Sequence, residues 1–109
     1  MKLVKCIVRP NKVDEVREAL EKASVSGMTI TEVRGHGRQK GHKAVYRGRE
    51  YDASLVPKTM IEMAVADELV DEVIAVAMNA ARTGDIGDGR IWVLSIEEGY
   101  NIRTAARDH

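Results

Sequence analysis

The sequence contains no phenylalanine, one tryptophan and three tyrosines among its 109 residues. A hydrophobic core must therefore be built from Val, Ile, Leu, Ala and Met. Cysteine is represented by Cys6 alone, which excludes a disulfide within the chain. No apolar run is long enough for a membrane-spanning helix, and the opening MKLVKCIVRPNK is too charged for a secretory signal. These absences predict a cytoplasmic protein.

Net charge is also absent, because 17 basic residues balance 17 acidic ones. The chain therefore lacks the bulk positive charge of a nucleic-acid coat protein. Residues 34–52 are locally basic, and an RNA-binding sheet would combine such a stretch with aromatic side chains for base stacking. Only Trp92 and Tyr100 lie near a predicted strand, so we expect no nucleic-acid partner.

Hydrophobic patterning predicts four strands and two helices. Strands are expected over residues 2–9, 28–35, 58–65 and 90–96, where apolar or β-branched residues recur. Helices are expected up to about residue 23 and about residue 82, with Asn11 and Asp67 as their N-caps. The order βαββαβ is that of the ferredoxin-like fold, in which two helices cover one face of an antiparallel sheet. We therefore predict a single α+β domain over residues 1–109.

Two features of the sequence are not explained by a single ferredoxin-like subunit: a long loop and a helix with a wide apolar face. Residues 36–56 have no apolar periodicity, and this loop is far longer than the ~4–6 residues usual in compact domains. Its arginines and tyrosines favour docking onto other proteins, with order gained on binding. The second predicted helix has an apolar face wider than the ~100° stripe that covers one sheet, which predicts a partner on its second side.

The segment TGDIGDGRIWV (residues 83–93) joins the second helix to the last strand. Gly84 can end the helix as its C′ residue, and the GDG triplet can turn the chain into the strand. Glycines also let backbone N–H groups approach phosphate oxygens, and Arg90 follows at once to neutralise charge. The segment is neither a Walker loop nor a dinucleotide fingerprint. The pattern alone leaves a simple turn and a ligand site both open.

Other chemistry has weaker support. His36, His42 and His109 with Cys6 lack the spacing of a closed metal site. No Ser-His-Asp order or pair of acids indicates a catalytic centre, so we do not expect an enzyme.

Several stretches, taken together, resemble the PII nitrogen-regulatory signal-transduction proteins. YRGREY (46–51) is similar to the tyrosine motif of that family's T-loop, and TGDIGDGRIWV is similar to its B-loop, which wraps a nucleotide. GRQKGH (37–42), Pro57-Lys58 and IRT (102–104) fall at the family's spacings. The resemblance spans essentially the whole chain. It implies a homotrimer with nucleotide clefts between neighbours, a T-loop at about 37–56, a B-loop at about 83–90 and a C-terminal tail at 97–109.

The resemblance also implies the ligands. ATP and ADP would compete for each cleft, and Mg²⁺ would enter with ATP. The implied nucleotide-binding residues are Thr29, Gly35, Gly37, Arg38, Gln39, Glu62, Gly87, Asp88, Gly89, Arg90 and Arg103. The effector 2-oxoglutarate, admitted with Mg-ATP, would contact Gln39, Lys58, Gly37 and Gly41. Gln39 would also reach the metal shell, and Lys58 would pair with the distal carboxylate.

By the same resemblance, the protein would control nitrogen-assimilation targets through its T-loop. Such targets include an ammonium channel, which would bring the protein to a membrane only indirectly, and enzymes of nitrogen metabolism. Tyr46, Arg47 and Tyr51 would contact the target, and Tyr51 corresponds to a tyrosine that many bacterial members have nucleotidylated. Asn101 stands where the family usually has a phosphate-facing arginine. This departure leaves open a divergent sensor that binds adenine nucleotide and another small anion, for example bicarbonate.

Overall fold

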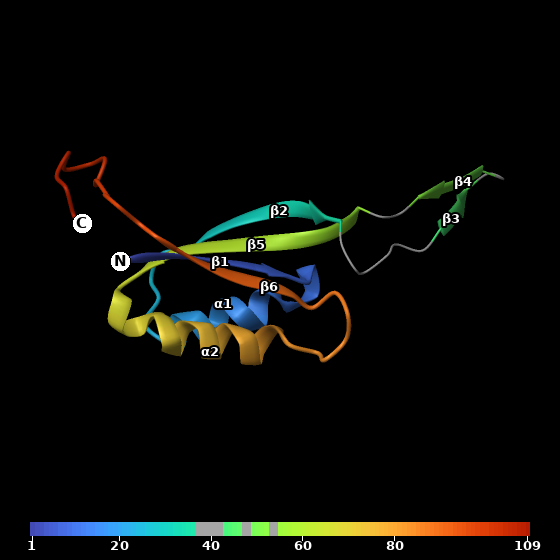
Figure 1. The fold of residues 1–109 in the computed structure, drawn as a ribbon, viewed down its shortest axis with the longest axis horizontal. Helices are drawn as coiled ribbons and strands as arrows, with labels where there is room; N and C mark the ends of the chain where they lie inside the picture. Colours follow the sequence, from blue (N-terminus) through green and yellow to red (C-terminus); the bar gives the residue numbers. More distant parts are fainter. Residues whose placement is uncertain (37–42, 47–48, 53–54) are drawn as a thin grey trace.

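The computed structural model describes residues 1–36, 43–46, 49–52 and 55–109. Its main sheet is antiparallel, with strand order β2-β5-β1-β6. These strands are β1 (Lys2–Val8), β2 (Thr29–Gly35), β5 (Val56–Val65) and β6 (Gly89–Ser95). The helices α1 (Val13–Lys22) and α2 (Val70–Ala81) lie side by side on one face of the sheet (Figure 1). The predicted α+β, ferredoxin-like order βαββαβ is confirmed.

The core lies between this sheet and the two helices, and it is aliphatic as predicted. Alternate residues of β1 point to the helices, and Val4, Cys6 and Val8 are at most 2% exposed. Burial raises the pKa of the Cys6 thiol to about 11, so Cys6 acts as a small apolar core residue. The other large side chains that are fully buried in the described ranges are Val16, Leu20, Ile61 and Val73. None of the helices in the described ranges is long and apolar enough to cross a membrane.

Both helices begin differently from the prediction. Residues Pro10–Lys12 form a 3-10 turn (η1), and α1 follows from Val13 with no side-chain cap, so Asn11 is not an N-cap. The fixed φ of Pro10 suits the first position of such a turn. A second 3-10 turn, η2 (Asp67–Leu69), precedes α2. The carboxylate of Asp67 does not cap the helix, because it pairs with the N-terminal ammonium at 2.8 Å.

Two short strands interrupt the segment that the sequence predicted as one long loop. Strands β3 (Lys43–Tyr46) and β4 (Arg49–Asp52) form a separate antiparallel pair, drawn beyond the end of the main sheet in Figure 1. The long connection predicted between the second and third strands of the main sheet is confirmed, but the two short strands within it were not predicted. The two strands are separated in the sequence by Arg47-Gly48, which is not one of the pairs, such as Asn-Gly or Asp-Gly, that favour a two-residue hairpin turn.

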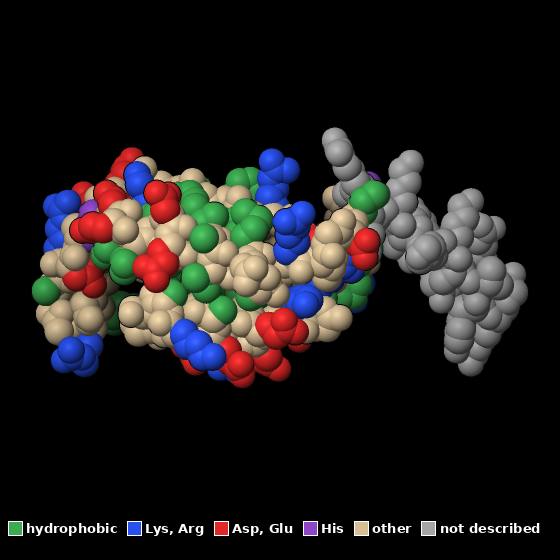
Figure 2. All heavy atoms as spheres, turned by 90° about the horizontal axis from the view of Figure 1, so that it is seen from below, with side chains coloured by type: hydrophobic (Ala, Val, Ile, Leu, Met, Phe, Trp, Pro, Cys, Tyr) green, Lys and Arg blue, Asp and Glu red, His purple; other side chains and the backbone are tan. Residues whose placement is uncertain are grey.

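The two faces of the domain differ in character. On the face seen from the helix side, acidic and basic side chains are interspersed (Figure 2). The opposite face of the sheet is not covered by any described part of the chain. Strand alternation places Trp92 and Leu94 there, 46% and 45% exposed, together with the half-buried Leu3, Ile7 and Met60.

Candidate functional site

A cleft of about 620 Å³ opens where β2 ends and β6 begins. Its walls come from the ends of β1, β2 and β5, from β6, and from the loop 83–89 that precedes β6. Of the predicted ligand-binding residues, the fold brings Gly35, Lys58, Gly87, Asp88, Gly89 and Arg90 together in this lining. These residues are far apart in the sequence, and the antiparallel pairing of the sheet brings them to one end.

The glycines of the loop are required by its backbone. Gly84, Gly87 and Gly89 have φ angles of +96°, +100° and +113°, a region that side chains disfavour. At Gly89 a Cβ atom would also lie 1.7 Å from the carbonyl oxygen of Ile7, so no side chain fits. Gly84 is not the residue directly after the helix cap, because α2 is capped by Arg82. The loop therefore exposes bare backbone at the wall of the cleft.

Lys58 provides a buried positive charge in the cleft. Its side chain passes close to Gly35, where a Cβ would lie 3.4 Å from the Lys58 Cγ. The residue is 8% exposed, and its Nζ donates a hydrogen bond to the carbonyl of Gly87. Within the described residues, no carboxylate forms an ion pair with Lys58. Burial, and secondly the cation of Arg9, lower the pKa of Lys58, while Asp88 opposes the shift. An incoming anion would supply the missing charge partner.

The carboxylate of Asp88 is used inside the loop. Its Oδ2 accepts hydrogen bonds from the backbone N–H groups of Thr83 (2.9 Å) and Gly84 (2.8 Å). Its Oδ1 accepts from the Thr83 hydroxyl and from the Nε of Arg9 (3.2 Å). Arg9 also donates to the carbonyl of Ile86 at 3.0 Å. The Thr83 hydroxyl, the two backbone N–H groups and Arg9 hold the pKa of Asp88 far below its ordinary range.

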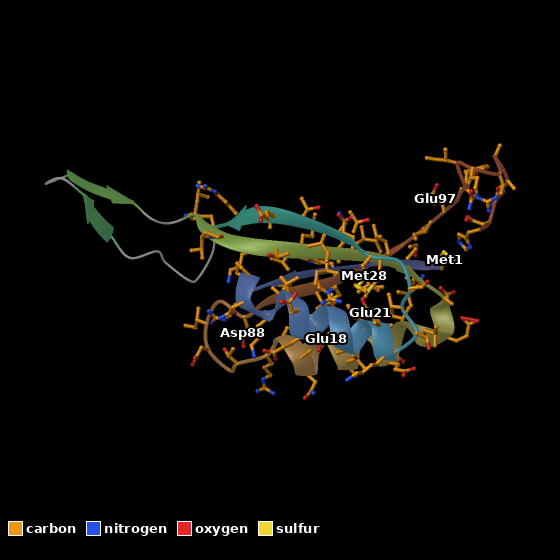
Figure 3. The ribbon with its side chains drawn as sticks, turned by 180° about the vertical axis from the view of Figure 1, so that it is seen from behind. Met1, Glu18, Glu21, Met28, Asp88 and Glu97 are labelled. Carbon is orange, nitrogen blue, oxygen red and sulfur yellow. The ribbon has the colours of Figure 1, made fainter. Side chains whose placement is uncertain are left out.

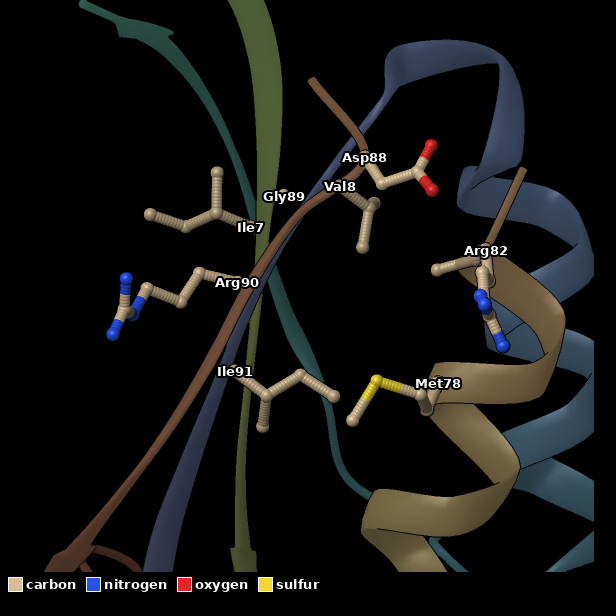
Figure 4. A pocket seen from close by; sticks show the side chains of 9 residues that line it. Ile7, Val8, Met78, Arg82, Asp88, Gly89, Arg90 and Ile91 are labelled. Atoms are coloured by element: carbon tan, nitrogen blue, oxygen red, sulfur yellow. The ribbon is translucent and has the colours of Figure 1, made fainter. Parts of the chain in front are cut away.

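A smaller pocket of about 220 Å³ lies on the other side of β6, against the end of α2 (Figure 4). There the side chain of Met78 faces Ile91. Asp88 lies on this helix side of the strand, whereas Arg90 points to the opposite side. The Arg90 guanidinium lies over the Trp92 ring, 5.6 Å from its centroid. Arg90 is thus exposed toward the larger cleft, and the Asp88 carboxylate is directed away from it.

Three other predicted nucleotide-binding residues lie away from this cleft. Thr29 and Glu62 are paired in the register of β2 and β5, and Glu62 forms an ion pair with Lys5 at 3.8 Å. Thr29 is six residues from Gly35, about 20 Å along the strand. Arg103 is exposed in the C-terminal tail.

The tail leaves the body at the far end of the sheet. Glu97 and Met1 lie near one end of the main sheet, and Asp88 lies near the other (Figure 3). The predicted nucleotide-binding residues of one chain are therefore spread along the sheet, from loop 83–89 at one end, past Glu62 and Thr29 about midway, to Arg103 in the tail. Gly37, Arg38, Gln39, Gly41 and Arg47 fall outside the described residues.

Tyr46 and Tyr51, which the resemblance predicts to contact a target, belong to β3 and β4, where Tyr46 pairs with Arg49 and Tyr51 with Ala44. In the tail, Asn101 closes a turn. Its side-chain oxygen accepts from the N–H of Thr104 at 3.1 Å, and its own N–H donates to Ala106 at 2.8 Å. Sequence reasoning treated Asn101 only as a missing charge and missed this role.

Comparison with known proteins identifies the family. Residues 1–106 match the family described as nitrogen regulatory protein P-II. The chain belongs to the P-II family. It is 53% identical over 108 residues to the nitrogen regulatory protein P-II of Rhizobium etli, covering 99% of this chain and 96% of the relative. It is 49% identical over 108 residues, with the same coverage, to the nitrogen regulatory protein GlnK of Escherichia coli K12.

A third P-II relative, from Haemophilus influenzae, is 51% identical over 104 residues, 95% of this chain and 93% of the relative. Membership of the P-II family confirms the resemblance seen in the motifs. It also identifies the chain as a nitrogen regulatory signalling protein, not an enzyme.

Proposed function

We propose that this P-II protein senses adenine nucleotides in the cleft beside loop 83–89. The exposed Arg90 and the bare backbone at Gly87 and Gly89 suit the phosphates of ATP or ADP. Arg38 and Gly37 would add phosphate contacts from the segment after β2. Mg²⁺ would arrive with ATP, with Gln39 as a ligand that contributes a hard amide oxygen.

The buried ammonium of Lys58 carries the second part of the proposal. A cation that is 8% exposed and has no carboxylate partner among the described residues suits a small dicarboxylate. We therefore assign 2-oxoglutarate to Lys58 and, through the metal shell, to Gln39, Gly37 and Gly41. Gln39 and Lys58 lie near the two ends of the segment 37–56, so effector contacts there can bias its conformation.

A second copy of the chain would complete the cleft. Thr29 and Glu62 lie about midway along the sheet, in one row with Lys5 and Trp92, and the tail that carries Arg103 leaves at the end opposite to loop 83–89 (Figure 3). A nucleotide held by both loop 83–89 and Arg103 would therefore need two chains. The uncovered apolar face of the sheet, which includes Trp92 and Leu94, supplies a surface for such an association. We propose the homotrimer that the PII motifs imply, in the cytoplasm.

The output of the sensor would be a change in target binding. Tyr46, Arg47 and Tyr51 would contact the target, which we take to be an ammonium channel or an enzyme of nitrogen metabolism. Tyr51 is also the proposed site of nucleotidylation.

Calorimetry tests this function. Titrating the protein with ADP and with Mg-ATP, each with and without 2-oxoglutarate, should give micromolar nucleotide binding and an effector that binds only with Mg-ATP. Light scattering should give three times the 12.1 kDa chain mass. A monomer without affinity for adenine nucleotides would refute the proposal.

The same titration separates the alternative, a sensor of adenine nucleotide and a different anion. Asn101 favours it, because this residue closes a turn and brings no cation where an arginine is usual. Nucleotide binding with a response to bicarbonate but none to 2-oxoglutarate would support that alternative.

A further inference from the structure

The loop 83–89 contains two acidic residues, although it is proposed to bind an anion. Asp85 is exposed, and its carboxylate accepts no hydrogen bond from the described residues. The carboxylate of Asp88, in contrast, accepts four hydrogen bonds and lies on the helix side of β6 (Figure 4). The Asp85 carboxylate is therefore free to repel a bound phosphate, whereas the Asp88 carboxylate is neutralised by its donors and directed away from it.

Asp88 organises the loop around itself. Both of its oxygens are occupied by donors from Thr83 and Gly84, which precede it by five and four residues. The fourth donor, Arg9, comes from the end of β1 and also binds the carbonyl of Ile86. Arg9 thereby ties the loop to the rigid sheet at two points. No spacing in the sequence indicates this link, because Arg9 and Asp88 are 79 residues apart.

We propose that Arg9 and Thr83, acting through the Asp88 carboxylate, are positioning residues of the nucleotide-binding loop. They hold residues 87–89 at the wall of the cleft and keep the Asp88 charge neutralised and directed away from the phosphates. This inference rests on the proposed nucleotide cleft. Its tests therefore include the wild type with ADP, which checks the cleft, and variant pairs, which check the positioning.

Asp88→Asn and Asp85→Asn form a matched pair. Each removes one negative charge from the same loop, so electrostatics alone predicts that both variants bind ADP as tightly as the wild type or more tightly. A positioning role for Asp88 instead predicts that the two substitutions change the affinity for ADP in opposite directions. Asp88→Asn should weaken ADP binding about tenfold or more, because an amide cannot accept all four hydrogen bonds. Asp85→Asn should keep or tighten it.

Thr83 provides a milder pair that preserves the fold. Thr83→Ser keeps the hydroxyl donor and should bind ADP as the wild type does. Thr83→Val has nearly the same shape without the donor and should bind several-fold more weakly, with a melting temperature only a few degrees lower because one hydrogen bond to Asp88 is lost. Arg9→Gln should behave like Thr83→Val.

Amide hydrogen exchange provides a readout that needs no ligand. In wild type, the N–H groups of Thr83 and Gly84 should exchange more slowly than in Asp88→Asn. If wild type binds no ADP, the proposed function fails, whereas the exchange result still judges the loop. The inference is overturned if Asp88→Asn binds ADP as well as Asp85→Asn does, if Thr83→Val matches Thr83→Ser, or if exchange at the two amides is unchanged.

Discussion

Replacing Gly89 by alanine is the most direct way to test how the cleft is built. Gly89 opens β6, opposite Val8, and has a φ of +113°. An added Cβ would lie 1.7 Å from the carbonyl oxygen and 2.8 Å from the carbonyl carbon of Ile7. Because both are backbone atoms of the neighbouring strand, a side-chain rotation cannot relieve the clash. The start of the β1–β6 ladder must move.

The size of the effect follows from two costs. A residue other than glycine in such a backbone conformation costs about 1–3 kcal/mol, and an overpacked site costs about 1–3 kcal/mol more. Together they predict a loss of about 2–6 kcal/mol, a large share of the ~5–15 kcal/mol typical of a domain. At about 4 °C per kcal/mol, the melting temperature should fall by about 8–24 °C.

Two other glycines serve as controls. Gly84 has a φ of +96° but nothing within 4 Å of its added Cβ, so Gly84→Ala carries only the backbone cost. Gly27 has open space and no positive φ, so Gly27→Ala should change stability by no more than about 0.5 kcal/mol. Thermal and urea unfolding should rank the losses Gly89 > Gly84 > Gly27, and ADP binding should fail in Gly89→Ala. Equal stability of the Gly89 and Gly27 variants, with wild-type ADP affinity, would refute the reasoning.

Three further predictions concern charge. Lys58→Ala should abolish 2-oxoglutarate binding and spare ADP, and calorimetry that finds unchanged effector affinity would remove Lys58 from the site. Because the pKa of Asp88 is depressed in the folded protein, its contribution to stability is complete above the ordinary aspartate value of about 3.9 and declines as pH falls below it. Urea unfolding between pH 2 and 5 should therefore show a shallower pH dependence for Asp88→Asn, and an identical slope would contradict this. Asn101→Arg should raise the affinity for ATP relative to ADP by about fivefold at most, and the control Asn101→Ala should not. A competition titration that finds the two variants alike would count against a phosphate near residue 101.

The strands, the helices and the aliphatic core were predictable because each depends on local patterning or composition. Alternation along residues 2–9 places Val4, Cys6 and Val8 on one face of a strand, and the structure buries all three. The helix starts were mispredicted because polar residues at Asn11 and Asp67 resemble caps. A proline-led 3-10 turn replaced the first cap, and an ion pair with the N-terminal ammonium engaged the second.

The candidate site was predictable only in part, for a similar physical reason. The glycines and Arg90 are contiguous, so their pattern is visible in the sequence. The contacts that shape the loop join Arg9 to Asp88 and Lys58 to Gly87, and no periodicity encodes such distant pairs. The role of Asn101 was not predicted, because an asparagine in the sequence can be interpreted either as the loss of a cation or as an amide that closes a turn.

Loop 83–89 and the C-terminal tail lie at opposite ends of the sheet (Figure 3). This separation has a consequence for assemblies that are mixed from two different variants. If a nucleotide is held by the loop end of one chain and the tail end of the next, damage at Arg90 and damage at Arg103 affect different sides of the same junction. Consider an Arg90 variant and an Arg103 variant, neither of which binds nucleotide alone. If they are unfolded and refolded together, some interfaces would pair an intact loop from one chain with an intact tail from the other. Binding capacity could then reappear in a blend of proteins that have none when refolded separately.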